Sequence, residues 1–331
     1  MTGTAGFRHL LVYCALTEDD AALLSFAARS AQAWDATVTL LGVVDLPADL
    51  DRVARVLKIA PPELRNRLVQ GRRDRLEALK AQAMPDLDAR IEIATGKPFI
   101  EVIRYCLRHD ADLVVKTAER LDGLNRFLFA STDQHLLRKC PCPVWLRLPG
   151  APGTGSTVLA AVDVDETAAS EPDTLAGLNR RIVMSALRAA GPGGTAHLLH
   201  VWDVPGEGLV RLWSGADSAD RVVRDYVAGV EASLRRGLER LVAEARAAEP
   251  DLVDAVRLIP RLARGSARTV IPEQVTHLGA DLLVMGTIAR TGVPGFIIGN
   301  TAEDILNGVD CSVMTVKPPN YISPVRLDAG S

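Results

Sequence analysis

Cysteine, aromatic residues and long apolar runs are all scarce in this chain. Only five cysteines occur in 331 residues, a small and odd number that argues against a disulfide framework. No apolar run approaches the roughly 18 residues that cross a bilayer, so we expect no membrane span. Residues 1–9 lack the apolar region of a secretory signal peptide. These absences lead us to expect a cytoplasmic protein.

Positive charge is not in excess either. The chain has 38 lysines and arginines against 41 aspartates and glutamates, a net charge of −3. A general nucleic-acid binder needs a basic face, so we expect no nucleic-acid partner. Hydrophobic residues make up 48% of the chain, which is ordinary for a globular protein with a core. The length exceeds that of one ordinary domain and favours two.

The motifs of common enzyme classes are absent as well. The sequence has no G-x-S-x-G elbow, no Walker loop and no H-E-x-x-H helix. Cys140 and Cys142 are one residue apart, not two as in zinc and thioredoxin sites, and we interpret them as buried cysteines at a helix–strand junction. Strand alternation places His197 and His200 on opposite faces, which disfavours a shared metal. We expect no catalytic residues and no metal site, with slow ATP hydrolysis left open.

What the chain does contain is an internal repeat. Copy one (residues 1–149) and copy two (157–331) are separated by a Pro/Gly/Ser-rich linker at 150–156. Strands alternating with helices of crossover length predict βαβ units and a parallel sheet in each copy. The expected strands are 9–14, 37–44, 89–93 and 142–146 in copy one, and 157–163, 196–201, 253–259 and 311–316 in copy two. The expected helices include 21–33, 62–83, 178–190 and 220–248.

The most informative stretch is 281–304, in copy two. A short apolar run, residues 282–285, reads as a buried parallel strand and ends at Gly286. Gly299 stands at the start of a helical pattern with Ile305 and Leu306 on its apolar side. A strand, a glycine loop and a helix N-terminus present backbone N–H groups and a positive dipole end to an anion. The sequence therefore predicts a phosphate site at the C-terminal edge of a parallel sheet.

This stretch resembles the nucleotide loop of the universal stress protein family. The family pattern is glycine, two residues, glycine, nine residues, glycine, then serine or threonine. Gly286 and Gly299 match the first and last glycines, whereas Ala289 replaces the middle glycine and Asn300 the hydroxyl residue, with Thr301 following. Together with the repeat, the resemblance covers nearly the whole chain. It implies an α/β fold: two doubly wound, Rossmann-like domains in tandem, similar to the adenine-nucleotide α-hydrolase-like folds.

The resemblance also implies a ligand and a set of contacts in copy two. ATP or AMP would bind, with magnesium if the ligand is ATP. Asp163 stands at the family's position for the acidic residue near adenine or ribose, and the backbone of Val201 at the position that meets adenine. Arg290 is suited to neutralise phosphate charge, and Asn300 to cap the helix and donate to phosphate. The implied nucleotide-binding residues are Asp163, Val201, Gly286, Ala289, Arg290, Gly299, Asn300 and Thr301.

Copy one departs further from the family pattern. Lys116 stands in place of the first loop glycine and Ala130 in place of the last, and side chains there narrow the space in which amides reach phosphate. Glu119 and Asp122 add negative charge. Cys14 stands where copy two has its acidic residue. We therefore expect no nucleotide in copy one.

Two functions remain open at this stage. The first is a nucleotide-responsive stress regulator acting through copy two. The alternative is an interaction scaffold, or a binder of another small or lipid-like ligand, in which the glycines serve only the turn. In both cases the last strands of the two copies are expected to pair into an internal pseudo-dimer, because pairing covers exposed sheet edges. A homodimer and an unknown protein partner stay open, and Trp213 is expected to cover a pocket or face the other copy.

Overall fold

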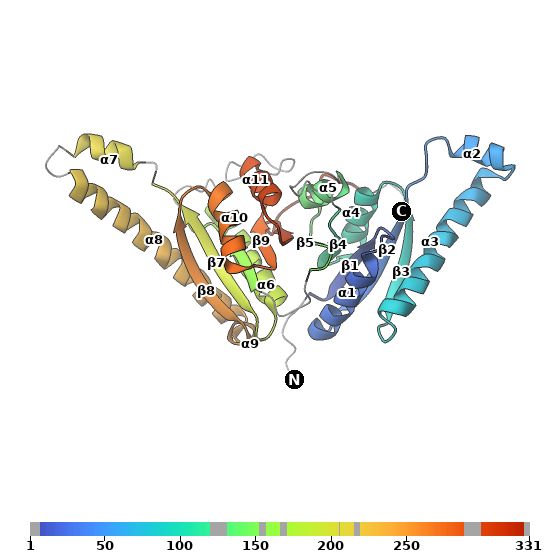
Figure 1. Ribbon diagram of the computed structural model, residues 1–331, viewed down its shortest axis with the longest axis horizontal. Coiled ribbons are helices and arrows are strands. Elements are labelled where there is room, and N and C mark those ends of the chain that lie inside the picture. The colour runs from blue at the N-terminus through green and yellow to red at the C-terminus, as the bar shows by residue number, and fades with distance from the viewer. Residues whose placement is uncertain are drawn as a thin grey trace.

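Strands and helices alternate along both copies of the chain (Figure 1). The computed structural model describes residues 7–119, 131–151, 157–165, 171–204, 206–214, 219–287 and 299–327. Copy one contains β1 (His9–Cys14), α1 (Asp20–Trp34), β2 (Thr37–Val44), α2 (Leu50–Leu57), α3 (Pro61–Ala83), β3 (Ala89–Thr95), α4 (Pro98–His109), β4 (Leu113–Thr117), α5 (Ser131–Lys139) and β5 (Val144–Arg147). Copy two contains β6 (Thr157–Ala161), α6 (Pro172–Ala190), β7 (Thr195–Trp202), α7 (Glu207–Trp213), α8 (Ala219–Ala248), α9 (Pro250–Ala255), β8 (Arg257–Arg264), α10 (Ala267–Leu278), β9 (Leu282–Gly286), α11 (Asn300–Gly308) and β10 (Ser312–Val316).

The described strands join one sheet in the order β3-β2-β1-β4-β5-β10-β9-β6-β7-β8. Neighbours within each copy are parallel. β5 and β10 are antiparallel, with Val313 opposite Leu146 and Thr315 opposite Val144. The predicted α/β fold and the predicted pairing of the last strands are both confirmed. This pairing covers one edge strand of each copy, which would otherwise expose unpaired N–H and C=O groups.

Helices cover both faces of the sheet. On one face, α1, α3, α6, α8 and α9 pack in a single buried cluster with the strands, and on the other face α4, α5, α10 and α11 do the same. Alternate strand residues supply the two faces: Leu10 and Val12 of β1 point to the first, Leu11 and Tyr13 to the second. Both clusters run through both copies, so the copies share their core. Among the described helices, none is long and apolar enough to cross a bilayer.

The turn from the third strand into the next helix has the same geometry in both copies. Gly96 and Gly265 have φ angles of +145° and +141°, which L side chains rarely adopt. The helices that follow, α4 and α10, both end at a residue in the left-handed conformation, Asp110 and Gly279 respectively. The two segments are therefore structural repeats of each other, as their sequences indicate.

The third strand of copy two begins later than predicted. Val253 lies in α9, and β8 starts only at Arg257. Pro250 is the first residue of α9, a position at which the missing N–H costs no hydrogen bond. The chain consequently makes an additional short helix before it enters the sheet.

The helix pairs α2–α3 and α7–α8 project at opposite ends of the molecule (Figure 1). The sequence predicted α3 and α8 but not the short helices that pack on them. Trp213, at the end of α7, is 84% exposed. The expectation that Trp213 covers a pocket or faces the other copy is therefore wrong, because α7 packs on α8 at the end of the sheet away from copy one.

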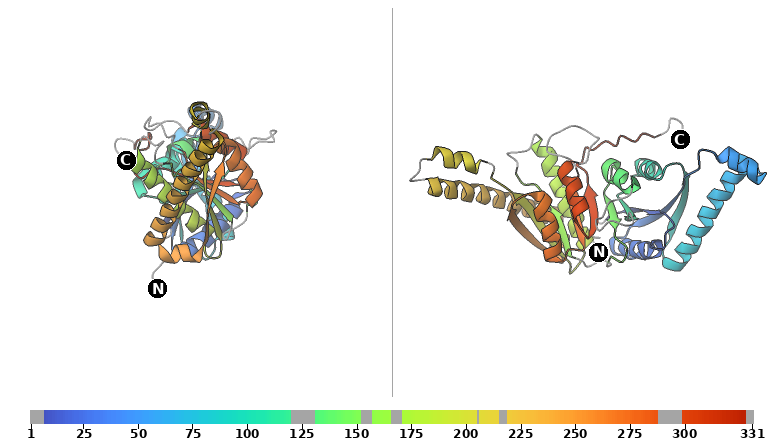
Figure 2. Two further views of the ribbon diagram at one scale, coloured as in Figure 1. Left: turned by 90° about the vertical axis from the view of Figure 1, so that its left-hand side faces the viewer. Right: turned by 45° about the horizontal axis from the view of Figure 1, so that its top comes forward.

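Beyond β10 the chain crosses onto copy one. The Tyr321 hydroxyl donates to the Arg138 carbonyl at 2.8 Å, and the Ser323 hydroxyl to the Lys139 carbonyl at 2.7 Å. Figure 2 shows this C-terminal segment running from β10 toward the helices of copy one. The segment satisfies carbonyl groups at the end of α5, which have no partner within the helix, and so ties copy two to α5.

Candidate functional site

The carboxyl ends of three adjacent strands meet at one edge of the sheet in copy two. β6 lies between β7 and β9, and its register, continued by two residues, sets Asp163 in the same row as Val201 and Thr287. The ends of adjacent parallel strands form the edge at which open α/β sheets bind ligands. Three elements thus bring the implied acidic residue, the implied adenine contact and the start of the glycine loop to one edge.

The backbone of Asp163 is held by α6. Its N–H donates to Asn179 Oδ1 at 3.1 Å, and its carbonyl accepts a hydrogen bond from Asn179 Nδ2. The Asp163 side chain is 25% exposed, and Oδ1 lies 3.8 Å from Nδ1 of the buried His200. Asn179 therefore fixes the position of Asp163, while part of the carboxylate still faces solvent. Sequence reasoning missed Asn179, for which the only signal is a polar residue on the apolar face of a helix.

Gly286 has a packing role of its own. A Cβ atom at this position would lie 2.8 Å from Cδ2 of Leu178, a residue of α6 that packs against the end of β9. That distance is shorter than real Cβ contacts, so a side chain here would displace Leu178. The close approach of α6 to β9 accounts for this glycine without a ligand.

Thr287 and Gly299, the described residues on either side of the glycine loop, meet at the start of α11. The Gly299 N–H donates to the Thr287 carbonyl at 3.3 Å, and Gly299 is the N-cap residue with φ −58° and ψ 139°. Among the described residues no side chain caps this helix: Asn300 is its first helical residue, so the expectation that Asn300 caps the helix is wrong. Asn300 and Thr301 are exposed. Within the part of the chain that the structure describes, the first turn of α11 therefore keeps backbone N–H groups without a side-chain cap.

Two residues implied by the resemblance, Ala289 and Arg290, lie outside the described residues. The same holds for Asp122 and Ala130 of the copy-one loop. Their expected roles stay predictions.

A buried lysine, which sequence reasoning missed, lies beneath the end of β9. Lys317 follows β10 and is 3% exposed. Its Nζ donates to the Leu137 carbonyl of copy one at 2.7 Å and to the hydroxyl of the buried Thr287. Burial lowers the pKa of Lys317 to about 7, against a smaller raising effect of Cys140. The lysine links the loop of copy two to α5 of copy one.

In copy one a carboxylate occupies the start of the equivalent helix. Asp133, in the first turn of α5, lies 2.8 Å from Nζ of Lys116 on β4, and both side chains are almost fully buried. Asp133 also accepts the backbone N–H of Glu119 at 2.8 Å, and the Glu119 carboxylate lies 2.8 Å from Lys116 Nζ. Burial raises the pKa of Asp133, and Lys116 opposes this shift. The protein itself thus supplies the anion at this loop.

The strand registers show that two positions of copy one were matched to the wrong residues of copy two in the sequence analysis. Val114 pairs with Val144 in copy one as Leu283 pairs with Val313 in copy two, a shift of 169 residues. This shift aligns Gly286 with Thr117, not with Lys116. In the first strands, Leu10 pairs with Leu113 as Val158 pairs with Leu282.

This second alignment sets Ala15, rather than Cys14, at the position of Asp163. Both errors arise because a one-residue slip is invisible in short apolar runs. Copy one still lacks both the glycine and the acid at these positions.

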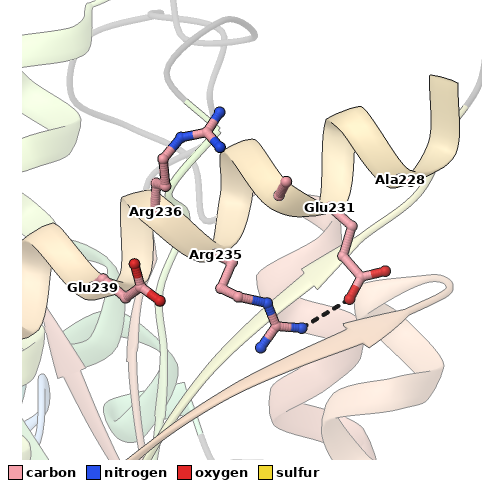
Figure 3. Close-up of a pocket in the computed structure, with 6 residues that line it drawn as sticks. Ala228, Glu231, Arg235, Arg236 and Glu239 are labelled. Atoms are coloured by element: carbon pink, nitrogen blue, oxygen red, sulfur yellow. Dashed lines mark hydrogen bonds and ion pairs between the residues drawn. The ribbon is translucent and has the colours of Figure 1, made fainter. Parts of the chain in front are cut away.

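A shallow hollow elsewhere on the surface runs along α8 (Figure 3). Its lining comes from this one helix: Ala228, Glu231, Ala232, Arg235, Arg236 and Glu239. Glu231 and Arg235 form an exposed ion pair at 2.8 Å. Alternating charges at helical spacing are typical of a solvated helix face, and this hollow brings together none of the strand ends described above.

Comparison with known proteins agrees with the repeat and the strand order. The sequence model of the Universal stress protein family matches residues 6–146 and, a second time, residues 157–317. The chain belongs to this family. Each match falls within one copy, so the protein is a tandem universal stress protein with an α/β Rossmann-like fold.

Curated relatives and solved structures align with most of the chain. Universal stress protein E of Salmonella typhi is 30% identical over 257 residues, which are 76% of each chain. That of Photorhabdus laumondii is 26% identical over 331 residues, covering 97% of this chain and 98% of the relative.

Among solved structures, a functionally unknown protein from Pseudomonas aeruginosa PAO1 aligns with a TM-score of 0.63 at 21% identity, covering 96% of this chain and 95% of the other. A universal stress protein from Archaeoglobus fulgidus aligns with a TM-score of 0.57 at 16% identity, covering 96% and 99%. Family membership supports a stress-response role, and the relatives are named as stress proteins rather than enzymes.

Proposed function

We propose that this universal stress protein is a stress regulator that binds one adenine nucleotide, ATP or AMP, in copy two. The contrast between the two loop helices carries the proposal. In copy one, Asp133 and Lys116 neutralise each other at the start of α5. In copy two, α11 begins at Gly299, which has no side chain with which to cap the helix, at the sheet edge that also holds Asp163 and Val201. A phosphate suits such a helix N-terminus because backbone N–H groups and the dipole both favour an anion.

Different residues of copy two would contact different parts of the nucleotide. Phosphate would lie against the backbone N–H groups of Asn300 and Thr301, with Gly299 leaving room for it and Arg290 as counter-charge. Asp163, positioned by Asn179, would accept hydrogen bonds from ribose or adenine, and the backbone at Val201 would meet the adenine edge. Magnesium would accompany ATP by neutralising phosphate oxygens. The protein would work by binding rather than turnover.

Isothermal titration with ATP and magnesium tests this proposal. We expect about one site per chain. Gly299→Val should weaken binding at least tenfold, about 1.4 kcal/mol, because a branched side chain crowds the phosphate position. The φ and ψ angles of Gly299 are ones that valine adopts readily, so the fold should be retained.

Ser131→Val is the matched control, since Ser131 is exposed at the start of the equivalent helix α5. Two equal sites, or equal ATP affinity of the Gly299→Val and Ser131→Val variants, would overturn the proposal.

The scaffold alternative has one specific observation in its favour. Leu178 of α6 already accounts for Gly286 through packing alone. If neither ATP nor AMP binds at millimolar concentration, the glycines of copy two serve the turn and the protein acts through its surfaces or another ligand.

A further inference from the structure

Three cysteines of copy one converge at a single point of the buried core, independently of the nucleotide proposal. Cys106 comes from α4, Cys140 follows α5, and Cys142 precedes β5. The Sγ–Sγ distances are 3.6 Å for Cys140–Cys142, 3.6 Å for Cys142–Cys106 and 4.0 Å for Cys106–Cys140. The sequence predicted buried cysteines at this junction, which the structure confirms. It did not predict Cys106, which lies 34 residues from Cys140.

The triangle of sulfur atoms has the dimensions of a metal site. A point in its plane lies about 2.2 Å from all three sulfur atoms, close to the metal–thiolate bond length of about 2.3 Å. An ion at that point needs little movement of the side chains. Among the described cysteine, histidine and acidic residues, these three cysteines are the group whose ligand atoms lie close enough together to hold one metal ion.

A buried cysteine can also serve simply as a small apolar side chain. Copy two shows whether that role requires cysteine at these three positions. The shift of 169 residues aligns Cys106 with Val275, Cys140 with Val309 and Cys142 with Cys311. Val275 and Val309 are buried in the same face of the core. Valine therefore suffices for packing at two of these positions, and the convergence of three thiols belongs to copy one.

Positive charge is also placed on this side of the junction. The antiparallel register of β5 and β10, continued by two residues, sets Lys317 opposite Cys142 and Leu148 opposite Cys311. The partly buried Arg181 donates to the carbonyl of Lys317 at 3.0 Å, so a second cation lies at this junction.

Within the described residues, both cations donate to carbonyl oxygens, and Lys317 also donates to the Thr287 hydroxyl; no ion pair joins either cation to a carboxylate. The buried Lys317 and the partly buried Arg181 thus lie on the side of the three thiols of copy one, whereas Leu148 lies opposite Cys311 of copy two. An anionic metal–thiolate centre would need such counter-charges.

We propose that Cys106, Cys140 and Cys142 form a binding site for one Cu(I) ion. On binding, the three thiols release their protons to solvent and the three sulfur atoms coordinate the ion, with no change of oxidation state. Cu(I) fits better than Zn(II) because it is soft and accepts three thiolates. Structural zinc sites take four ligands, and every cysteine and histidine of the chain lies in the described residues, with no fourth one in this group.

Anaerobic titration of the reduced full-length chain with Cu(I), in competition with bathocuproine disulfonate, tests the site. We expect one Cu(I) per chain and an ultraviolet sulfur-to-copper charge-transfer band. Cys106→Val/Cys140→Val, which installs the residues of copy two, should fold as judged by circular dichroism and weaken binding at least 100-fold. Cys311→Ser and Cys14→Ser remove buried cysteines outside the cluster and should bind as the wild type does.

Three outcomes would overturn the proposal: no Cu(I) retained by the wild type, equal retention by the double valine variant, or stoichiometric Zn(II) binding without Cu(I). A count of free thiols in denaturant adds a fourth. Five free thiols are expected after aerobic purification and removal of copper. A count of three free thiols would mean that two cysteines of the cluster form a disulfide instead.

Discussion

The strand ends and helix starts that flank the loops have one arrangement in the two copies and opposite chemistry. Lys116 and Asp133 form a buried ion pair in copy one, and the same register places Met285 and Ala302 at these positions in copy two. The first-turn carboxylate of α5, Asp133, is buried and paired with Lys116, whereas the first-turn carboxylate of α11, Glu303, is partly exposed and pairs with Arg138 at 3.1 Å. This difference shows that two copies of a repeat can keep the same strand order and still differ at the helix start. One copy balances the buried charge there with its own side chains, and the other leaves the helix start open to a ligand.

The largest expected effect comes from breaking the ion pair of copy one. Lys116→Met leaves the buried Asp133 carboxylate without its cation, which should lower the free energy of unfolding by about 3–5 kcal/mol. Lys116→Met/Asp133→Ala reproduces the residues of copy two and should recover most of that loss. Urea denaturation of the single and double variants measures both.

The exposed pair Arg67–Glu63, with side chains 64% and 50% exposed, is the control for this experiment. Arg67→Met should change stability by less than about 1 kcal/mol. A double variant as unstable as Lys116→Met alone would contradict the assignment of the loss to an unpaired carboxylate.

The second prediction concerns the pH dependence that Lys317 gives to stability. Its pKa is about 7 in the folded protein and about 10.4 when unfolded, so between these values the unfolded state binds more protons. The free energy of unfolding therefore rises with pH in this window. Relative to Lys317→Leu, which installs the residue type of the equivalent Leu148, the wild type should gain about 2 kcal/mol from pH 7 to 9. Denaturation curves of reduced, metal-free protein at both pH values provide the comparison; parallel behaviour of the two proteins would refute it.

The smallest expected effect distinguishes packing from ligand binding at Gly286. Gly286→Ala places a methyl group against Leu178, which should cost about 1 kcal/mol of stability because one flexible side chain must move. The same substitution in a Leu178→Ala background should cost almost nothing. Thermal denaturation of the four proteins forms a double-mutant cycle, and equal costs in the two backgrounds would exclude Leu178 as the reason for this glycine.

Much of the fold could be predicted from sequence because its signals are local. Short apolar runs alternating with amphipathic helices predict βαβ units, and the repeated segments around Gly96 and Gly265 show that the unit occurs twice. The last strands could be expected to pair because each would otherwise leave an open edge. The start of β8 was predicted too early. The short helix that begins at Pro250 interrupts the apolar run, but the composition of that run gives no sign of the interruption.

The chemistry of the loops was harder to predict because it depends on contacts between distant residues. Nothing in the local sequence shows that Lys116 meets Asp133, or that Lys317 reaches Leu137 across the junction. The same is true of Cys106 and Cys140, which only the packing of α4 against α5 brings together. The one-residue slips at Thr117 and Ala15 have a related cause: apolar strands carry no internal marker of register, which only the neighbouring strand supplies.

The antiparallel pairing of β5 with β10 also has a consequence for how this protein can change over evolution. An assembly of two identical chains about a twofold axis receives every substitution twice, so a lysine introduced on one side of the seam appears on the other. When both halves belong to one chain, a substitution in one half leaves the other half unchanged. Lys317 can lie opposite Cys142 while Leu148 lies opposite Cys311, and each half can specialise while the tether keeps them together at high effective concentration.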